Sequence, residues 1–115
     1  MKIIHLNVNG LVAKKYKVIE FLNIEKPDVL ALSETHLKGK DEFDVKGYEW
    51  YGVNYERAIR GSRGVGFLVK KGIKYQTIKH DTDLMEEGRS VCLQIGRTQV
   101  HIIYMPVNTE PYDKI

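Results

Sequence analysis

The sequence predicts an α+β fold, with one mixed β-sheet and a helix that flanks it. The chain opens with a strand, a helix and a strand joined by short connections, an order that favours a parallel pair with a right-handed crossover. Further strand-like segments follow one another closely, and glycines mark the places where hairpin turns join them. A crossover unit followed by antiparallel strands is typical of a mixed sheet.

Hydrophobic periodicity defines the opening unit. Residues 2–9 alternate well enough to form the first strand, and residues 28–34 are the short, continuously apolar run expected of a strand buried on both faces. Between them, residues 11–26 repeat apolar side chains at helical spacing until Pro27 stops the helix. The apolar residues of this helix are Val12, Tyr16, Ile19 and Leu22.

The later strand candidates are separated by glycine turns and one long polar loop. The loop covers residues 54–63 and carries several arginines, and we expect the residues after Pro106 to form a loop as well. The strand candidates are residues 48–53, 64–71, 73–79, 89–96 and 98–105. We expect one sheet to contain the strands at 2–9, 28–33, 64–70, 89–95 and 100–105, with the helix near 12–25 on its outer face.

One helix can cover only one face of such a sheet. Segments such as DVLALSE and HIIYM are too apolar to face water on both sides. We therefore expect the second face either to meet another layer or to belong to a longer domain. Because that face would be bare, we also expect the chain by itself to aggregate or to be molten.

Bulk composition places the chain among ordinary globular proteins. Its 115 residues fit one domain at most, and 43% of them are hydrophobic and 29% are charged. The net charge of +3 permits a phosphate-rich partner without arguing for one. A single cysteine excludes a disulfide framework or a cysteine-based zinc site, and no run is long enough to cross a membrane. We expect an intracellular, soluble protein that does not engage a membrane.

Polar side chains end the two strands of the opening unit. Asn7 and Asn9 close the first strand, and Glu34 closes the second. The carboxyl ends of parallel strands meet at one edge of a sheet, where open sheets place their ligands. One carboxylate flanked by amides suits Mg²⁺, which takes few protein ligands and keeps its waters. The alternative is structural: Glu34 would cap the following loop, and the asparagines would satisfy turn backbone.

Other polar residues carry weaker signals. Tyr104, in the segment IIYMPVN, could hydrogen-bond a phosphate or could be a core residue with its hydroxyl at the rim. The segment RGSRGVG lacks the lysine and the spacing of a phosphate-cradling loop, although its Arg63 is a candidate nucleic-acid contact. The histidines lack metal-ligand spacing and are predicted to be structural or surface residues: His5, His36, His80 and His101.

Four motifs occur in a fixed order along the chain: LNVNGL, LSETHL, SRGVGFLVKK and IYMPVN. Together they resemble the endonuclease/exonuclease/phosphatase superfamily, whose members include deoxyribonuclease I and the apurinic/apyrimidinic endonucleases of the exonuclease III type. The first three look most like the endonuclease domain that precedes a reverse transcriptase in non-LTR retrotransposons, which would place the protein in the nucleus. The resemblance covers nearly the whole chain but only the first half of that domain.

The resemblance implies a four-layer αββα sandwich with two facing sheets and helices outside. This chain would supply one sheet and its helix, and the apolar inner face would meet a sheet from the missing C-terminal half. The implied cofactor is Mg²⁺ or Mn²⁺. The implied partners are the phosphodiester backbone of DNA and that missing half of the domain.

The resemblance also implies roles for individual residues. Asn7 looks like the asparagine that orients the phosphate and the nucleophile, and Glu34 looks like the metal-binding glutamate. Tyr104 looks like the tyrosine that hydrogen-bonds the scissile phosphate. Asn9 stands where many relatives carry an acidic residue that assists the metal, and its amide makes it a weaker ligand.

The predicted function is that of a Mg²⁺-dependent phosphodiester hydrolase, a DNA endonuclease with little activity alone. Family members also carry an Asp-x-Asn motif and a C-terminal Asp-His pair, and this sequence contains neither. In the family, the aspartate of the first motif activates or positions the attacking water, and the histidine of the second lies at the scissile phosphate. Without these two residues, we expect most of the rate acceleration to be missing. The alternatives are an inert, non-enzymatic fragment and a lipid or inositol phosphate phosphatase of the same fold.

Overall fold

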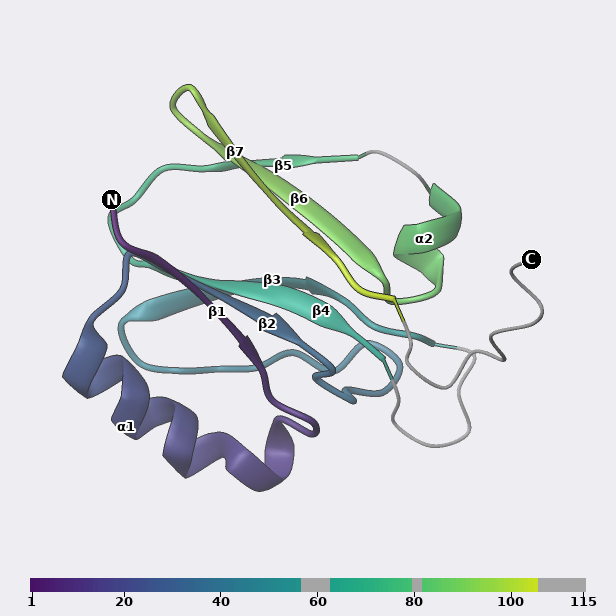
Figure 1. Cartoon of the computed structure of the whole chain (residues 1–115), viewed down its shortest axis with the longest axis horizontal. Coiled ribbons are helices and arrows are strands. Elements are labelled where there is room, and N and C mark those ends of the chain that lie inside the picture. The colour runs from purple at the N-terminus through teal and green to yellow at the C-terminus, as the bar shows by residue number, and fades with distance from the viewer. Residues whose placement is uncertain (57–62, 80–81, 106–115) are drawn as a thin grey trace.

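The computed structural model describes residues 1–56, 63–79 and 82–105 (Figure 1). The elements are β1 (Ile3–Asn7), the short 3-10 helix η1 (Val12–Lys14), α1 (Lys15–Glu25), β2 (Val29–Ser33), β3 (Tyr48–Val53), β4 (Val65–Lys70), β5 (Gln76–Ile78), α2 (Thr82–Glu86), β6 (Ser90–Ile95) and β7 (Thr98–Ile103). Among the described helices, none is long and apolar enough to span a membrane. The predicted loop after Pro106, most of the polar loop and His80 lie outside the described residues.

The strands form two sheets that lie face to face. A mixed four-stranded sheet has the order β1-β2-β4-β3, and a smaller sheet has the order β5-β6-β7. As predicted, β1 and β2 are parallel, and the remaining pairs are antiparallel. The prediction that residues 89–95 and 100–105 join the first sheet is wrong, because β6 and β7 lie across its face (Figure 1).

Burial explains why β6 lies across the first sheet. Its Val91, Leu93 and Ile95 pack against side chains from β2 and β4 such as Val29 and Phe67. Strand alternation puts these three residues of β6 on one face, so a single face-to-face contact removes all of them from water. The inner face that we expected to be bare is therefore covered by the chain's own second sheet. Our reason for expecting aggregation is accordingly wrong.

The outer face of the first sheet is covered by α1. Val18 and Leu22 are buried against Leu30, Leu32 and Leu68. The helix ends where Lys26 adopts a left-handed conformation with φ 47° and donates its N–H to the carbonyl of Leu22.

The predicted apolar stripe of the helix was wrong at its beginning. Val12 is 73% exposed and Tyr16 is 84% exposed, whereas Leu11 is buried. Val12 lies in a 3-10 turn with about three residues per turn, so its side chain does not follow the 3.6-residue period of α1. Tyr16 lies in α1 two residues before Val18, which turns it to the opposite face from Val18 and Leu22.

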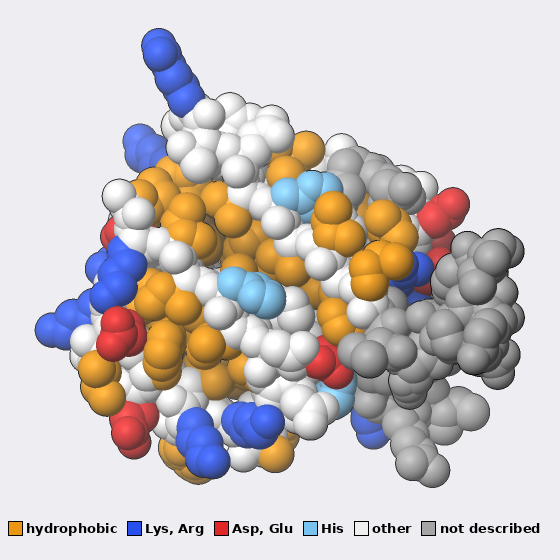
Figure 2. Space-filling view, viewed as in Figure 1, with side chains coloured by type: hydrophobic (Ala, Val, Ile, Leu, Met, Phe, Trp, Pro, Cys, Tyr) orange, Lys and Arg blue, Asp and Glu red, His pale blue; other side chains and the backbone are white. Residues whose placement is uncertain are grey.

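The sandwich has two flanks, each made by one edge strand from each sheet. Glu49 of β3 lines one pocket with Gln76 and Thr77 of β5, so β3 and β5 share one flank, and β1 and β7 are the edge strands of the other. Figure 2, in the same view as Figure 1, shows hydrophobic side chains gathered between the two sheets, with lysine or arginine side chains at the margin of this face. Ile3 on β1 is 40% exposed and Ile103 on β7 is 58% exposed.

Candidate metal and phosphate site

Backbone hydrogen bonds bring the ends of β1 and β2 together. Beyond the last paired residues, the N–H of Val8 donates to the carbonyl of Ser33, and the N–H of Gly10 donates to the carbonyl of Glu34, at 3.0 and 2.8 Å. The segment after β1 therefore follows the segment after β2 for several residues. This arrangement puts Asn7, Asn9 and Glu34 at the same edge of the sheet, as the sequence predicts.

Glu34 is at the centre of this edge. Its carboxylate accepts a hydrogen bond on Oε2 from the side-chain amide of Asn7. The other oxygen, Oε1, lies 3.9 Å from Nε2 of His36. The Glu34 side chain is 22% exposed, so the carboxylate is partly shielded and still reaches solvent. A carboxylate in this position can exchange its protein hydrogen bonds for a cation.

Tyr104 reaches the same carboxylate from the second sheet. Its backbone is fixed just after β7 by two bonds to Arg89, from the Tyr104 N–H to the Arg89 carbonyl at 2.7 Å and from Arg89 Nε to the Tyr104 carbonyl at 3.2 Å. Burial raises the pKa of Tyr104. The negative charge of Glu34 and a hydrogen bond with it raise this pKa further, and the charge of Arg63 opposes the rise. The phenol is therefore a neutral donor at physiological pH.

The backbone around this site adopts an unusual conformation. Of the five described residues other than glycine that have positive φ angles, four lie here: Asn9 at 44°, Glu34 at 55°, His36 at 58° and Arg63 at 54°. Each costs about 1–2 kcal/mol for a residue with a Cβ atom, less for asparagine. Such residues tend to cluster at functional sites, where the surrounding structure holds them. Composition and spacing gave no signal for this clustering.

The structure explains why the first glycine of the segment SRGVG, Gly64, stands at this position. It has φ 90°, and a Cβ atom at this position would lie 2.2 Å from Oγ1 of Thr35. Its carbonyl accepts the N–H of Thr35, and its own N–H donates to Gly88. The glycine therefore lets the start of β4 approach the segment that carries Glu34. It has a structural role at this site.

Arg63 is held by neighbouring side chains. Its Nη1 lies 3.1 Å from Oε1 of Glu87, and its guanidinium carbon lies 4.3 Å above the centre of the Tyr55 ring. Arg89 donates to the same Glu87 oxygen at 3.2 Å. The guanidinium of Arg63 thus contributes positive charge near Tyr104 from a fixed position.

The structure distinguishes Asn9 from Asn7. β1 ends at Asn7, so Asn9 is positioned by left-handed backbone and not by strand alternation. The Asn9 side chain is exposed and forms no hydrogen bond with another described residue. Of the two predicted amides, only Asn7 contacts Glu34.

Two histidines near this edge differ in their contacts. His36 was predicted to be structural or on the surface, yet its ring lies beside the Glu34 carboxylate. The only signal available in the sequence was its position two residues after Glu34. His5, which was also predicted to be structural or on the surface, is exposed, and its ring bonds the buried Ser33 hydroxyl at 2.7 Å.

The donor set is compatible with Mg²⁺. Glu34 offers a carboxylate oxygen, and Asn7 and Asn9 each offer an amide oxygen, which are ligand types that this ion accepts while keeping several waters. Within the described residues, no group of three or more histidine, cysteine, aspartate or glutamate side chains could hold a metal. These residues therefore fit part of a metal shell.

The comparisons with known proteins define the family. A sequence profile of the Endonuclease/Exonuclease/phosphatase family matches residues 4–110. The chain belongs to this family. A DNA-(apurinic or apyrimidinic site) endonuclease of Dictyostelium discoideum is 34% identical over 116 residues, which cover 92% of this chain and 30% of that protein.

Solved structures share the fold. An AP endonuclease from Archaeoglobus fulgidus superposes with a TM-score of 0.76 at 23% identity, over 99% of this chain and 46% of that one. The AP endonuclease LMAP from Leishmania major gives a TM-score of 0.73 at 21% identity, over 98% of this chain and 42% of that one. The Neisseria 3′ phosphatase NExo, solved with a product DNA hairpin, gives 0.74 at 22% identity, over 99% and 46%.

These matches refine two predictions. The chain spans less than half the length of these structures, and the predicted boundaries of a partial domain stay a prediction. It contributes strands to both sheets of the fold, in contrast to the prediction that it would supply one. The proteins named above are apurinic/apyrimidinic endonucleases and a 3′ phosphatase, and they do not support the narrower resemblance to retrotransposon endonucleases.

Proposed function

We propose that this chain carries the metal-binding and phosphate-binding part of a Mg²⁺-dependent phosphodiesterase that acts on DNA. The observation that carries the proposal is the convergence of Asn7, Glu34 and Tyr104 from three strand ends and two sheets. The named relatives are consistent with a DNA substrate, since one is an apurinic/apyrimidinic-site endonuclease and another is bound to a product DNA hairpin.

Each residue would have a distinct task. Glu34, with the amide oxygens of Asn7 and Asn9, would hold Mg²⁺ or Mn²⁺. When bound, the ion would polarise the phosphate and offset the charge that develops during hydrolysis. Asn7 would orient the Glu34 carboxylate, which it already contacts. Tyr104 would donate its hydroxyl proton in a hydrogen bond to a non-bridging phosphate oxygen, because its raised pKa keeps it protonated.

The proposal includes low activity for the 115-residue chain alone. Hydrolysis requires a base that takes a proton from the attacking water and an acid that gives one to the leaving oxygen. The sequence contains neither the Asp-x-Asn nor the Asp-His motif that the family uses. General acid–base catalysis contributes about 10²–10⁴ in rate, so cleavage should be slower than that of an extended protein by at least this factor.

Mn²⁺ binding and nicking of supercoiled plasmid test the proposal together. The wild-type chain should bind Mn²⁺ weakly in a paramagnetic resonance titration, and Glu34→Gln should abolish that binding. The control is Glu20→Gln, which removes an exposed carboxylate on α1. Mn²⁺ binding that survives Glu34→Gln would refute the metal assignment. Nicking by the short chain as fast as by an extended protein would show that a complete site lies within these residues.

Two finer assignments have their own tests. We propose that Asn9 is a weak ligand, so Asn9→Asp should tighten Mn²⁺ binding by supplying a second carboxylate. We propose that Arg63 attracts the DNA backbone by its charge, so Arg63→Gln should weaken binding of a short duplex and reduce its salt dependence. An unchanged salt slope would assign Arg63 to its contacts with Glu87 and Tyr55 alone.

The retrotransposon context is a separate hypothesis that rests on the motifs LNVNGL, LSETHL and SRGVGFLVKK. The nucleotide sequence downstream of the codon for Ile115 tests it. An open frame that encodes Asp-x-Asn, Ser-Asp-His and then a polymerase would support it. An open frame that completes the nuclease domain without a polymerase would reject it.

A further inference from the structure

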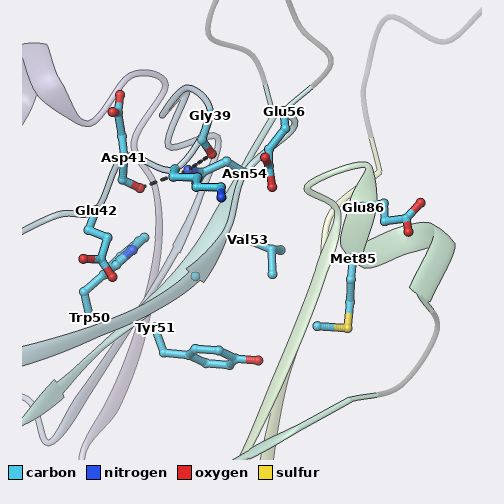
Figure 3. Close-up of a pocket in the computed structure, with 12 residues that line it drawn as sticks. Gly39, Asp41, Glu42, Trp50, Tyr51, Val53, Asn54, Glu56, Met85 and Glu86 are labelled. Carbon is cyan, nitrogen blue, oxygen red and sulfur yellow. Dashed lines mark hydrogen bonds between the residues drawn. The ribbon is translucent and has the colours of Figure 1, made fainter.

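A cavity lies on the flank of the sandwich where β3 is the edge strand. Its volume is about 340 Å³, and it extends from the loop around Gly39, across β3, to α2 (Figure 3). It is separate from the site at Glu34 and independent of the proposed function. Its lining includes four carboxylates and one lysine: Asp41, Glu42, Glu56, Glu86 and Lys40. The cavity is thus acidic on a chain whose net charge is +3.

The backbone of β3 presents hydrogen-bonding groups to this cavity. β3 and β4 are paired so that Tyr48 lies opposite Lys70 and Gly47 lies opposite Lys71. The N–H of Lys71 donates to the carbonyl of Gly47, so this is a hydrogen-bonded pair. Hydrogen-bonded and non-hydrogen-bonded pairs alternate in antiparallel sheets. The peptide groups of Trp50 and Gly52 must therefore point away from β4.

Tyr48 supports this orientation, because it alternates along β3 with Trp50 and Gly52 and its peptide group should also point away from β4. Its N–H donates to the carbonyl of Val45, outside the sheet, at 3.2 Å. The N–H groups of Trp50 and Gly52 have no acceptor among the described residues. Two outward peptide groups of an edge strand thus line the cavity, without the proline or the inward lysine that commonly protects such an edge.

The walls of the cavity are held in place by close contacts. The Trp50 ring lies over two glycines, since a Cβ atom on Gly52 or Gly66 would fall 2.5 or 2.2 Å from it. Phe43 packs edge-on against the same ring, with a centroid distance of 6.1 Å. On the rim, the Asn54 amide donates to the carbonyls of Gly39 and Asp41 at 2.9 and 3.0 Å (Figure 3).

Figure 3 shows Tyr51 and Met85 reaching into the space between β3 and α2, with Glu56 above this space, Glu86 on α2 and Glu42 beside Trp50. The aromatic ring and the thioether can contact the aliphatic part of a bound side chain, and the carboxylates can contact a positive charge at its end. Lysine and arginine side chains have this composition. Strand addition to an exposed edge is a known mode of peptide binding, in which main-chain bonds give affinity and side-chain pockets give selectivity.

We propose that the outer edge of β3 binds an extended segment of a partner protein that carries lysine or arginine at alternate positions. The segment would pair with the outward peptide groups of Trp50 and Gly52. Its basic side chains would share one face of the added strand and would lie against Glu56 and Glu86 on the α2 side of the cavity.

Trp50 is the single tryptophan of the chain and lines the cavity, so its fluorescence reports binding directly. The probe is a capped six-residue peptide in which lysine and valine alternate. We expect a saturable change in Trp50 emission. The double variant Glu56→Gln/Glu86→Gln should weaken binding roughly threefold or more, and Glu20→Gln on α1 should leave it unchanged.

Two N-methylated versions of the peptide test pairing without altering the protein. Methyl groups on one alternate set of amides would block hydrogen bonds to β3, and methyl groups on the other set would leave those bonds free. We expect only one version to bind. Equal binding of both versions would overturn strand addition, as would equal binding of a glutamate–valine peptide. Peptide-independent dimerisation through β3 would also overturn the proposal, because a second copy would then be the occupant.

Discussion

The side-chain amide of Asn7 donates to the carboxylate of Glu34 across the ends of β1 and β2. The two residues are far apart in the sequence, and parallel pairing brings them together. The carboxylate is therefore oriented by the fold before any cation or substrate arrives. This relationship leads to a direct test.

Asn7→Ala should lower the free energy of unfolding by about 1–2 kcal/mol, because it removes a hydrogen bond to a partly shielded carboxylate. Urea denaturation followed by Trp50 fluorescence would measure the loss. Asn9→Gly is the matched control, since it keeps the left-handed backbone and removes an exposed amide. It should change the free energy by less than about 0.5 kcal/mol. Equal effects of the two substitutions would contradict a special role for Asn7.

Gly64→Ala should be far more destabilising than Gly72→Ala. Both glycines have positive φ, 90° and 97°, so both substitutions carry a backbone cost of roughly 1–2 kcal/mol. Only at Gly64 would the new methyl group overlap Thr35, which adds roughly 1–3 kcal/mol. The free energies of unfolding of the two variants, measured by heat or urea, differ by the cost of the overlap with Thr35. A difference near zero would mean that the Thr35 segment can move aside.

Leu93→Ala should destabilise the first sheet although Leu93 belongs to the second. The residue is fully buried in the cluster that joins the two sheets, and such a truncation costs about 2–5 kcal/mol. Trp50, in the first sheet, should report the whole loss if the sheets unfold together. Ile103→Ala, at a residue that is 58% exposed, should have a much smaller effect. An unchanged Trp50 transition in Leu93→Ala would show that the two sheets unfold separately.

Stability should fall at alkaline pH. Burial raises the pKa of five groups above their ordinary values: Tyr48, Tyr51, Tyr75, Tyr104 and Cys92. Each holds its proton more tightly in the folded chain, so this contribution is intact below the unfolded pKa of about 9–10 and is lost as pH rises through the folded values. Urea midpoints from pH 8 to 11 would measure the decline. Tyr51→Phe should make it shallower, whereas Tyr16→Phe, at a residue 84% exposed, should not.

The sequence predicted the parts of this fold that local patterns determine. The parallel pair of β1 and β2, the helix between them and the antiparallel β4 follow from periodicity, Pro27 and glycine turns. Sheet membership did not follow, because a strand such as β6 has the same alternating pattern whether it extends a sheet or packs across one. The deciding quantity was the apolar area of the β2 and β4 inner face, which only the tertiary structure reveals.

The candidate site was predicted to a similar degree. Strand order alone places Asn7 and Glu34 at one edge, and the structure joins them. Tyr104 required the family resemblance, because the position of its strand in the second sheet is not encoded locally. The left-handed backbone at Glu34 and His36 and the close approach of Gly64 to Thr35 were missed. They depend on contacts between segments that are remote in the sequence.

The order of strands in the two sheets has a consequence for how the chain folds during synthesis. Each strand from β2 onward can pair with a neighbour that is already made or is the next to be made, and only the edge strands β3 and β5 must wait, β3 for β4 and β5 for β6. The first sheet can therefore assemble from its β1–α1–β2 unit before the second sheet emerges. Until β6 arrives, Val29 and Phe67 remain in water. A growing chain that pauses between β4 and β6 should be the species most prone to capture by chaperones.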